Sequence, residues 1–239
     1  MARTFNRAAS DKIVSAATAA LNPANITIAG WININSTAGF DGGFGTRASV
    51  GTSSPGWATI QQTGPPRISF QGSGNFGGWN SGTTNITFGV WMHLAVYSNG
   101  PGNTGAFYVN GSLNSTAGSM SAAVSGNCML SAGLATSFNT YLDGTLADIA
   151  IWNTVLTPTE IGSLARGGRP GGIRPANLLV WWPMDGQQSL EPDLSGKGNN
   201  GTLTGTAPGF NPPISQFTPR WPRTVESGIR RALQPQIVT

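Results

Sequence analysis

Carboxylates come first among the residues that could do chemistry, because a pair of them can supply an acid and a nucleophile. Retaining glycoside hydrolysis needs two carboxyl groups about 5 Å apart. Only two glutamates precede the C-terminal region: Glu160, which we expect to cap a helix, and Glu191, which we expect in a loop beside Pro192. The aspartates never stand two residues apart, the spacing that would place a pair on one face of a strand; they are Asp11, Asp41, Asp143, Asp148, Asp185 and Asp193. The sequence therefore predicts no catalytic residues.

The single histidine and the single cysteine argue against two other kinds of site. His93 lies in an alternating segment beside Trp91, and we expect a hydrogen-bonded structural residue there and not the base of a Ser-His-Asp triad. Cys128 stands in an apolar segment and is expected in the core. A zinc site would need several Cys, His or carboxylate ligands, which the chain does not offer. No metal site and no intrachain disulfide are predicted.

Aromatic residues in or near glycine-rich segments form the candidate ligand-binding surface. They are Trp57, Phe76 and Trp79, with Asn80 beside the last of them. Exposed rings next to an amide could bind a sugar, because ligand sites combine aromatic surface with a few placed polar groups. The alternative is that at least two of these rings fill the core.

The elements that must position these residues are short strands. The chain has 239 residues, with 34 glycines and 16 prolines, only 9% charged residues, 38% hydrophobic residues and eight tryptophans. Residues 26–34 (ITIAGWINI) alternate with isoleucine on one face, which indicates a half-buried strand. Further strands are predicted at 57–61, 67–71, 91–97, 106–109, 128–132, 146–152 and 178–182. This pattern favours an all-β, two-sheet antiparallel sandwich.

One short helix is predicted after the strand at 146–152. Thr157, Pro158 and Glu160 form a capping-box sequence, and Ile161 and Leu164 follow at helical spacing. Gly167 and Gly168 are expected to end it. We expect a connection of about two turns outside the core.

The C-terminal region from residue 208 is predicted to be an extended arm, because its prolines cannot sit in central strands. Residues 218–239 carry four arginines against one glutamate. The arm could be solvated, or it could dock on an acidic partner surface; its candidate contact residues are Arg220, Trp221, Arg223, Arg230 and Arg231. Nucleic acid is a weaker candidate because aromatics are not interleaved with a basic groove. No signal peptide or membrane-spanning segment is visible.

Five segments, in order, resemble the laminin-G-like domains of the concanavalin A-like, jelly-roll type. They are residues 26–34 (ITIAGWINI), 91–96 (WMHLAV), 107–111 (FYVNG), 141–152 (YLDGTLADIAIW) and 156–161 (LTPTEI). The resemblance covers about residues 5 to 166 and implies a jelly-roll sandwich. Glucanases of this fold carry Glu-x-Asp-x-x-Glu on one strand, which this chain lacks, so no enzymatic activity is expected.

The C-terminal part of the chain resembles the segment that normally opens such a domain. Residues 178–186 (LLVWWPMDG) and 193–203 (DLSGKGNNGTL) carry this likeness. One interpretation is that a second, truncated domain begins here. The other is that the order of the segments is permuted and that this segment completes the same sandwich. We favour the permuted order because about 60 residues cannot build another sandwich. The predicted units are therefore a sandwich at 1–207, closed by 178–203, and an arm at 208–239.

Relatives of this type often bind calcium through aspartate and carbonyl oxygens, so Ca²⁺ is the cofactor to consider. Asp143, Asp148 and the 193–199 loop lie in matching regions, but Lys197 opposes a cation and turn-stabilising roles are favoured. We expect no bound cofactor, with calcium as the alternative.

The permuted arrangement resembles proteins encoded by tailed bacteriophages. The resemblance implies a non-enzymatic virion structural protein, a capsid decoration or appendage subunit. It would lie in the virion, contact other capsid proteins and form a homo-oligomer, without binding a membrane. The alternative is a carbohydrate-binding module for a host-surface or extracellular polysaccharide.

Overall fold

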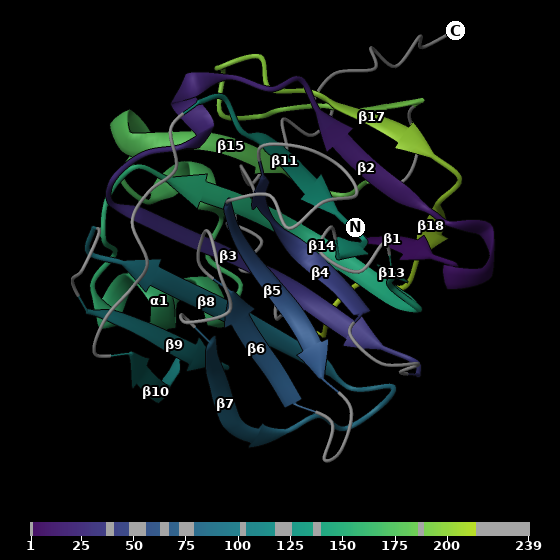
Figure 1. Ribbon diagram of the computed structural model, residues 1–239, viewed down its shortest axis with the longest axis horizontal. Coiled ribbons are helices and arrows are strands. Elements are labelled where there is room, and N and C mark those ends of the chain that lie inside the picture. The colour runs from purple at the N-terminus through teal and green to yellow at the C-terminus, as the bar shows by residue number, and fades with distance from the viewer. Residues whose placement is uncertain are drawn as a thin grey trace, which may run out of the picture.

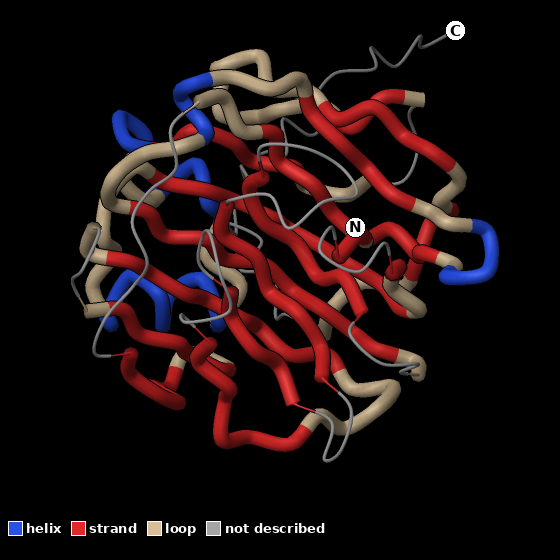
Figure 2. The backbone as a smooth tube through the Cα atoms, viewed as in Figure 1, coloured by secondary structure: helices blue, strands red, loops and turns tan. Residues whose placement is uncertain are grey.

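The computed structural model describes residues 2–36, 41–47, 56–62, 67–71, 79–100, 104–117, 126–135, 140–185 and 189–213. Within these segments strands dominate and short helical turns lie at the periphery (Figure 2). Two antiparallel sheets pack face to face, and the sheet containing β4, β5 and β6 lies in front of the one containing β3 and β8 (Figure 1). The predicted all-β sandwich is confirmed.

We name the first sheet, sheet A, by its path β10-β9-β8-β3-β14-β1-β18, with β15 also paired to β14. Its strands are β1 (Ala2–Phe5), β3 (Ile26–Ile34), β8 (Trp91–Ser98), β9 (Gly105–Val109), β10 (Ser112–Ala117), β14 (Gly144–Trp152), β15 (Leu178–Trp182) and β18 (Ala207–Gly209). The strands β3 and β15 have the bounds expected from the sequence.

Sheet B follows the order β16-β17-β2-β11-β4-β5-β6-β7. Its strands are β2 (Lys12–Ser15), β4 (Asp41–Arg47), β5 (Gly56–Gln62), β6 (Arg67–Gln71), β7 (Trp79–Asn85), β11 (Met129–Ala132), β16 (Leu190–Glu191) and β17 (Gly201–Thr204). A separate pair joins β12 (Leu134–Ala135) to β13 (Thr140–Tyr141). Cys128 makes an isolated bridge with Thr18 just before β11.

The first and last parts of the described chain meet along β14. The first half of β14 pairs with β1, where Arg3 lies opposite Leu146, and its second half pairs with β15, where Ile149 lies opposite Trp182. In sheet B, β17 pairs with β2. The segment from β15 to β17 therefore contributes strands to both sheets, and pairing continues to Gly209 in β18.

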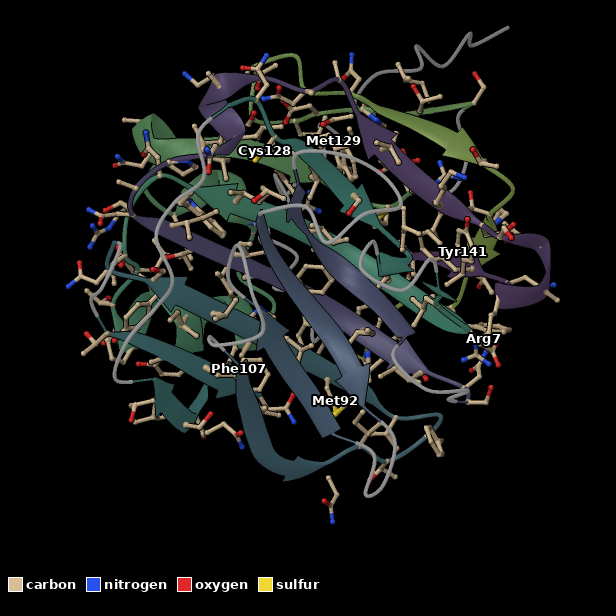
Figure 3. The ribbon with its side chains drawn as sticks, in the orientation of Figure 1. Arg7, Met92, Phe107, Cys128, Met129 and Tyr141 are labelled. Atoms are coloured by element: carbon tan, nitrogen blue, oxygen red, sulfur yellow. The ribbon has the colours of Figure 1, made fainter. Side chains whose placement is uncertain are left out.

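The main core lies between the two sheets. Because side chains alternate along a strand, the even-numbered isoleucines of β3 point into this core with Met92 and Phe107, which Figure 3 labels. Trp182 and Phe44 are fully enclosed in the same cluster. The core thus draws on strands from β1, which contributes Phe5, to β17, which contributes Leu203.

The prediction that β3 is half-buried is wrong, because its outer face is covered as well. The outer residues Ala29 and Trp31 are buried. A second hydrophobic cluster covers this side of sheet A, and it includes residues of the helix α1 (Pro158–Ala165). The covering segment also contains the helical turns η4 (Pro170–Gly172) and η5 (Pro175–Asn177); two others, η1 (Arg7–Ala9) and η2 (Ala19–Leu21), lie elsewhere.

The capping box of α1 is confirmed. The Thr157 side chain accepts a hydrogen bond from the Glu160 backbone N–H, and the Glu160 carboxylate accepts one from the Thr157 backbone N–H. The helix ends at Ala165, just before the predicted glycines. Ile161 and Leu164 are buried in the second cluster, so α1 belongs to a core layer and is more than an outside connection. Within the described segments, no helix has the length and apolarity needed to cross a membrane.

Candidate functional site

The sequence-predicted ligand residues lie at the edge of what the structure describes. The backbone places Trp57 on β5, opposite Thr46 of β4, and it places Trp79 and Asn80 on β7, opposite Gln71 and Phe70. The side chains of Trp57, Trp79 and Asn80, and all of Phe76, lie outside the described residues. The same holds for the arm residues Arg220, Trp221, Arg223, Arg230 and Arg231. Their proposed roles stay predictions.

Both glutamates of the described chain hold structure together. Glu160 caps α1 and also accepts a hydrogen bond of 2.7 Å from Arg174 Nε. Burial opposes the charge of Glu160, but the hydrogen bonds from Arg174 and Thr157 outweigh it and lower the pKa of its carboxyl. Glu191, predicted in a loop, lies instead in β16 and is fully buried.

Glu191 is paired with Arg3 inside the protein. Arg3 Nε donates to Glu191 Oε2 at 2.8 Å, and the Met184 backbone N–H donates to Glu191 Oε1 at 2.6 Å. Burial raises the pKa of the Glu191 carboxyl against the opposing attraction of Arg3. Because each carboxylate oxygen accepts a hydrogen bond, the Glu191 carboxylate has a structural role and connects β1 to the C-terminal segment.

The 193–199 loop, a possible calcium site from the sequence, is held by backbone hydrogen bonds to the Asp193 carboxylate. Asp193 Oδ1 accepts hydrogen bonds from the N–H groups of Trp181 and Ser195, and Asp193 Oδ2 accepts one from Asn199 N–H, each at 2.9 Å. Asp143 accepts hydrogen bonds from Asn35 and Ser36. Among the residues that the structure describes, no three His, Cys, Asp or Glu side chains gather around one metal position.

Asp148 lies at a bulge in β14, where the pairing with β3 shifts register. Its φ of 46° is in the left-handed region, which short polar side chains tolerate better than most. Asp148 Oδ1 accepts a hydrogen bond of 3.1 Å from the indole N–H of Trp181. Burial raises the pKa of the Asp148 carboxyl, which this hydrogen bond partly offsets. These contacts fit the turn-anchoring role favoured by the sequence.

His93 is buried at a small cavity on the outer side of sheet A. The cavity measures about 10 Å³, and Trp31, Asp148 and Pro170 line it with His93. The Trp31 and His93 rings meet edge-on with centroids 5.2 Å apart. The His93 backbone N–H donates to Asn110 Oδ1 at 2.9 Å, whereas His93 Nδ1 has no hydrogen-bond partner among the described residues. Burial lowers the pKa of His93 to about 3.

We expect His93 to make the protein less stable as the pH falls below 6.5. The unfolded chain takes up a proton near the ordinary pKa of 6.5, whereas the folded chain does so only near 3, so acid favours unfolding across this window. One histidine should lower the free energy of unfolding by about 1.5–2 kcal/mol between pH 6.5 and pH 5. Urea unfolding at these two pH values measures the change.

The control for this prediction is His93→Gln, whose neutral amide does not titrate. Its unfolding free energy should depend less on pH over the same interval, whatever its absolute stability. Asp148 faces the same cavity, and its raised pKa gives a contribution of opposite sign at lower pH. An unchanged pH slope in His93→Gln would show that His93 is not the buried neutral group.

A row of side chains crosses the outer face of sheet A beyond α1. Trp91 of β8 pairs with Asn33 of β3, Asn33 pairs with Thr145 of β14, and Thr145 pairs with Thr4 of β1. Paired residues on neighbouring strands share a face. All four are partly exposed, and we call this row of Trp91, Asn33, Thr145 and Thr4 the polar strip.

The polar strip rests on apolar residues and is joined by its own hydrogen bonds. Trp91 packs against the buried cluster that contains Trp31. Asn33 Nδ2 donates to the Gly89 carbonyl at 3.1 Å, and the Thr4 and Thr145 hydroxyl oxygens are 3.3 Å apart. Sequence reasoning missed the strip, although Asn33 occupies an outward position of the predicted alternating strand.

Residues 7–162 match the family model Laminin_G_3, described as the concanavalin A-like lectin/glucanases superfamily. No match was found among curated protein sequences. The C-terminal strands β15 to β18 lie outside the matched region, although they complete both sheets.

Three solved structures illustrate the fold similarity. A candidate carbohydrate-binding protein from Bacteroides ovatus aligns with a TM-score of 0.63 and 16% identity over 86% of this chain and 58% of that protein. A heptameric SAP-like pentraxin from Limulus polyphemus aligns with a TM-score of 0.56 and 18% identity, over 69% and 81% of the two chains. A CBM40 module of a Ruminococcus gnavus sialidase, bound to α2,3-sialyllactose, aligns with a TM-score of 0.51 and 12% identity, over 60% and 83%.

Proposed function

Because the chain belongs to the concanavalin A-like lectin/glucanases superfamily, we propose that its β-sandwich is a carbohydrate-binding module without hydrolytic activity. The observation that carries the proposal is the two-sheet sandwich itself, of which residues 7–162 match that superfamily. Two proteins of similar fold support the proposed carbohydrate binding. The B. ovatus protein is described as a candidate carbohydrate binder, and the R. gnavus module is bound to sialyllactose.

The absence of hydrolysis is proposed from the carboxylates. A glycosidase needs an acid and a second carboxyl group on either side of the scissile bond. In the described residues Glu160 caps a helix, Glu191 is buried against Arg3, and Asp193 accepts three backbone hydrogen bonds. None of these three is free to serve such a pair.

The intact protein, fluorescently labelled, should bind at least one glycan class on an array of oligosaccharides and bacterial polysaccharides. The bound glycan, incubated with the protein and analysed by mass spectrometry, should keep its length. Binding to no glycan would refute the proposed function, and shortened products would refute the non-hydrolytic part of it.

The virion role expected from the sequence, with its capsid partners and homo-oligomer, remains a separate proposal. Its candidate contact residues all lie in the C-terminal arm, outside the described residues. Carbohydrate binding does not depend on it, and a virion protein could have both properties.

A further inference from the structure

We propose that the polar strip is the carbohydrate site and that it selects neutral, extended glycan chains. This inference rests on the proposed function and adds the face, the residues and the ligand class. It also places the site on sheet A, whereas the sequence-predicted residues Trp57, Trp79 and Asn80 lie on strands of sheet B.

The length of the strip suits a short chain of sugars. The four residues lie on the adjacent strands β8, β3, β14 and β1. Neighbouring strands are about 4.8 Å apart, so the strip extends about 14 Å across the sheet, more than a single sugar ring needs. The Trp91 indole at one end offers a flat apolar surface for the carbon face of a sugar.

The polar groups of the strip have hydrogen-bonding capacity to spare. Asn33 Oδ1 is buried and has no hydrogen-bond partner among the described residues, while Nδ2 of the same amide donates to the Gly89 carbonyl. Each of the Thr4 and Thr145 hydroxyls has one donor and two acceptor positions, and one hydrogen bond between them uses only part of this capacity. A sugar hydroxyl supplies both a donor and an acceptor and so fits a row of this kind.

The strip itself is uncharged, and the two arginines nearest to it in sequence are engaged elsewhere. None of its four residues is charged, and Arg3, the neighbour of Thr4, is buried against Glu191. Arg7 donates to the Tyr141 and Ser36 carbonyl oxygens, and both residues of the Arg7–Tyr141 pair are labelled in Figure 3. Asp143, further along β14, accepts hydrogen bonds from Asn35 and Ser36. Both of these arginines are therefore held by other groups of the protein.

Both ends of the strip carry features that fit a bound chain. A Cβ at Gly209 would lie 2.7 Å from both Thr4 Oγ1 and Thr145 Cγ2, so the close approach of β18 to these two side chains requires glycine. Phe210 follows and is 91% exposed. At the other end Phe88 and Val90 precede Trp91 and are exposed. Apolar rims around a polar row favour an elongated, uncharged ligand.

The test is a calorimetric titration of the intact protein with the best glycan from the array. Trp91→Ala and Thr145→Val, which removes a hydroxyl and keeps the side-chain shape, should each weaken binding about tenfold, the loss that about 1.4 kcal/mol produces. Leu113→Ala, at a residue that is 58% exposed on β10, is the matched control and should bind like the wild type. Urea unfolding confirms that each variant is folded, and Thr145→Val decides if Trp91→Ala does not fold.

The outcomes separate the two proposals. If the wild type binds no glycan, the proposed function fails. If the wild type binds but folded Trp91→Ala and Thr145→Val bind equally well, the strip is not the site, and Trp57→Ala and Trp79→Ala then test sheet B. If binding is confined to sialylated or uronic-acid glycans, the neutral selectivity is refuted while carbohydrate binding stands.

Discussion

Glu191→Gln should lower the free energy of unfolding by about 3–5 kcal/mol, because removing one charge of a buried pair leaves the other uncompensated. Arg3 is 2% exposed and Glu191 is fully buried. The substitution would weaken the contact between β1 and the C-terminal segment, because Glu191 also accepts a hydrogen bond from the Met184 N–H. Urea unfolding at pH 7, followed by fluorescence, measures the change.

One further variant serves as a control for this prediction, and a double variant tests whether the lost stability can be recovered. Arg174→Met breaks the partly exposed pair with Glu160 and should change stability far less, because solvent screens that pair. Arg3→Met combined with Glu191→Leu should recover much of the loss, because apolar residues can replace a buried pair without leaving a lone charge. Equal losses in Glu191→Gln and Arg174→Met would contradict the buried pairing.

Trp182→Ala should also cost about 3–5 kcal/mol, the usual range for removing a large aromatic side chain from a core. Trp182 is fully buried between the sheets, and its indole N–H donates to the Asn199 carbonyl at 2.8 Å. A Cβ at Gly201 of β17 would lie 2.9 Å from the Trp182 ring, which shows how closely the C-terminal strands pack around it. The unfolding midpoint in urea measures this effect.

Leu190→Ala serves as the control, since Leu190 lies in the same C-terminal segment but is 41% exposed. Its unfolding free energy should stay close to that of the wild type. If Trp182→Ala were as stable as Leu190→Ala, the C-terminal strands would not share the main core, and the sandwich would be complete without them.

The sequence was informative wherever apolar residues alternated. Isoleucine at four of the five even-numbered positions identified β3, and the capping box identified α1. By contrast, β4 reads Asp-Gly-Gly-Phe-Gly-Thr-Arg, which has little intrinsic strand preference. It is a strand because β11 and β5 pair with its two edges. Such partners are distant in sequence, so no local pattern could reveal this strand.

The same distinction applies to the buried ion pair and to the polar strip. Arg3 and Glu191 are 188 positions apart, and neither residue type predicts burial by itself. The outer face of β3 was predicted to be solvent-exposed. It is buried because the second hydrophobic cluster, which includes residues of α1, packs against it. Asn33 could have been noted as an outward residue of an alternating strand, but its place beside Trp91 and Thr145 depends on strand register.

A crystal structure of the intact protein with its glycan tests the central claim, that this sandwich binds carbohydrate on the outer face of sheet A. We predict a neutral oligosaccharide with one ring against the Trp91 indole and its hydroxyls hydrogen-bonded to Thr4 and Thr145. A glycan bound over β5 to β7, or elsewhere than on the polar strip, would contradict it.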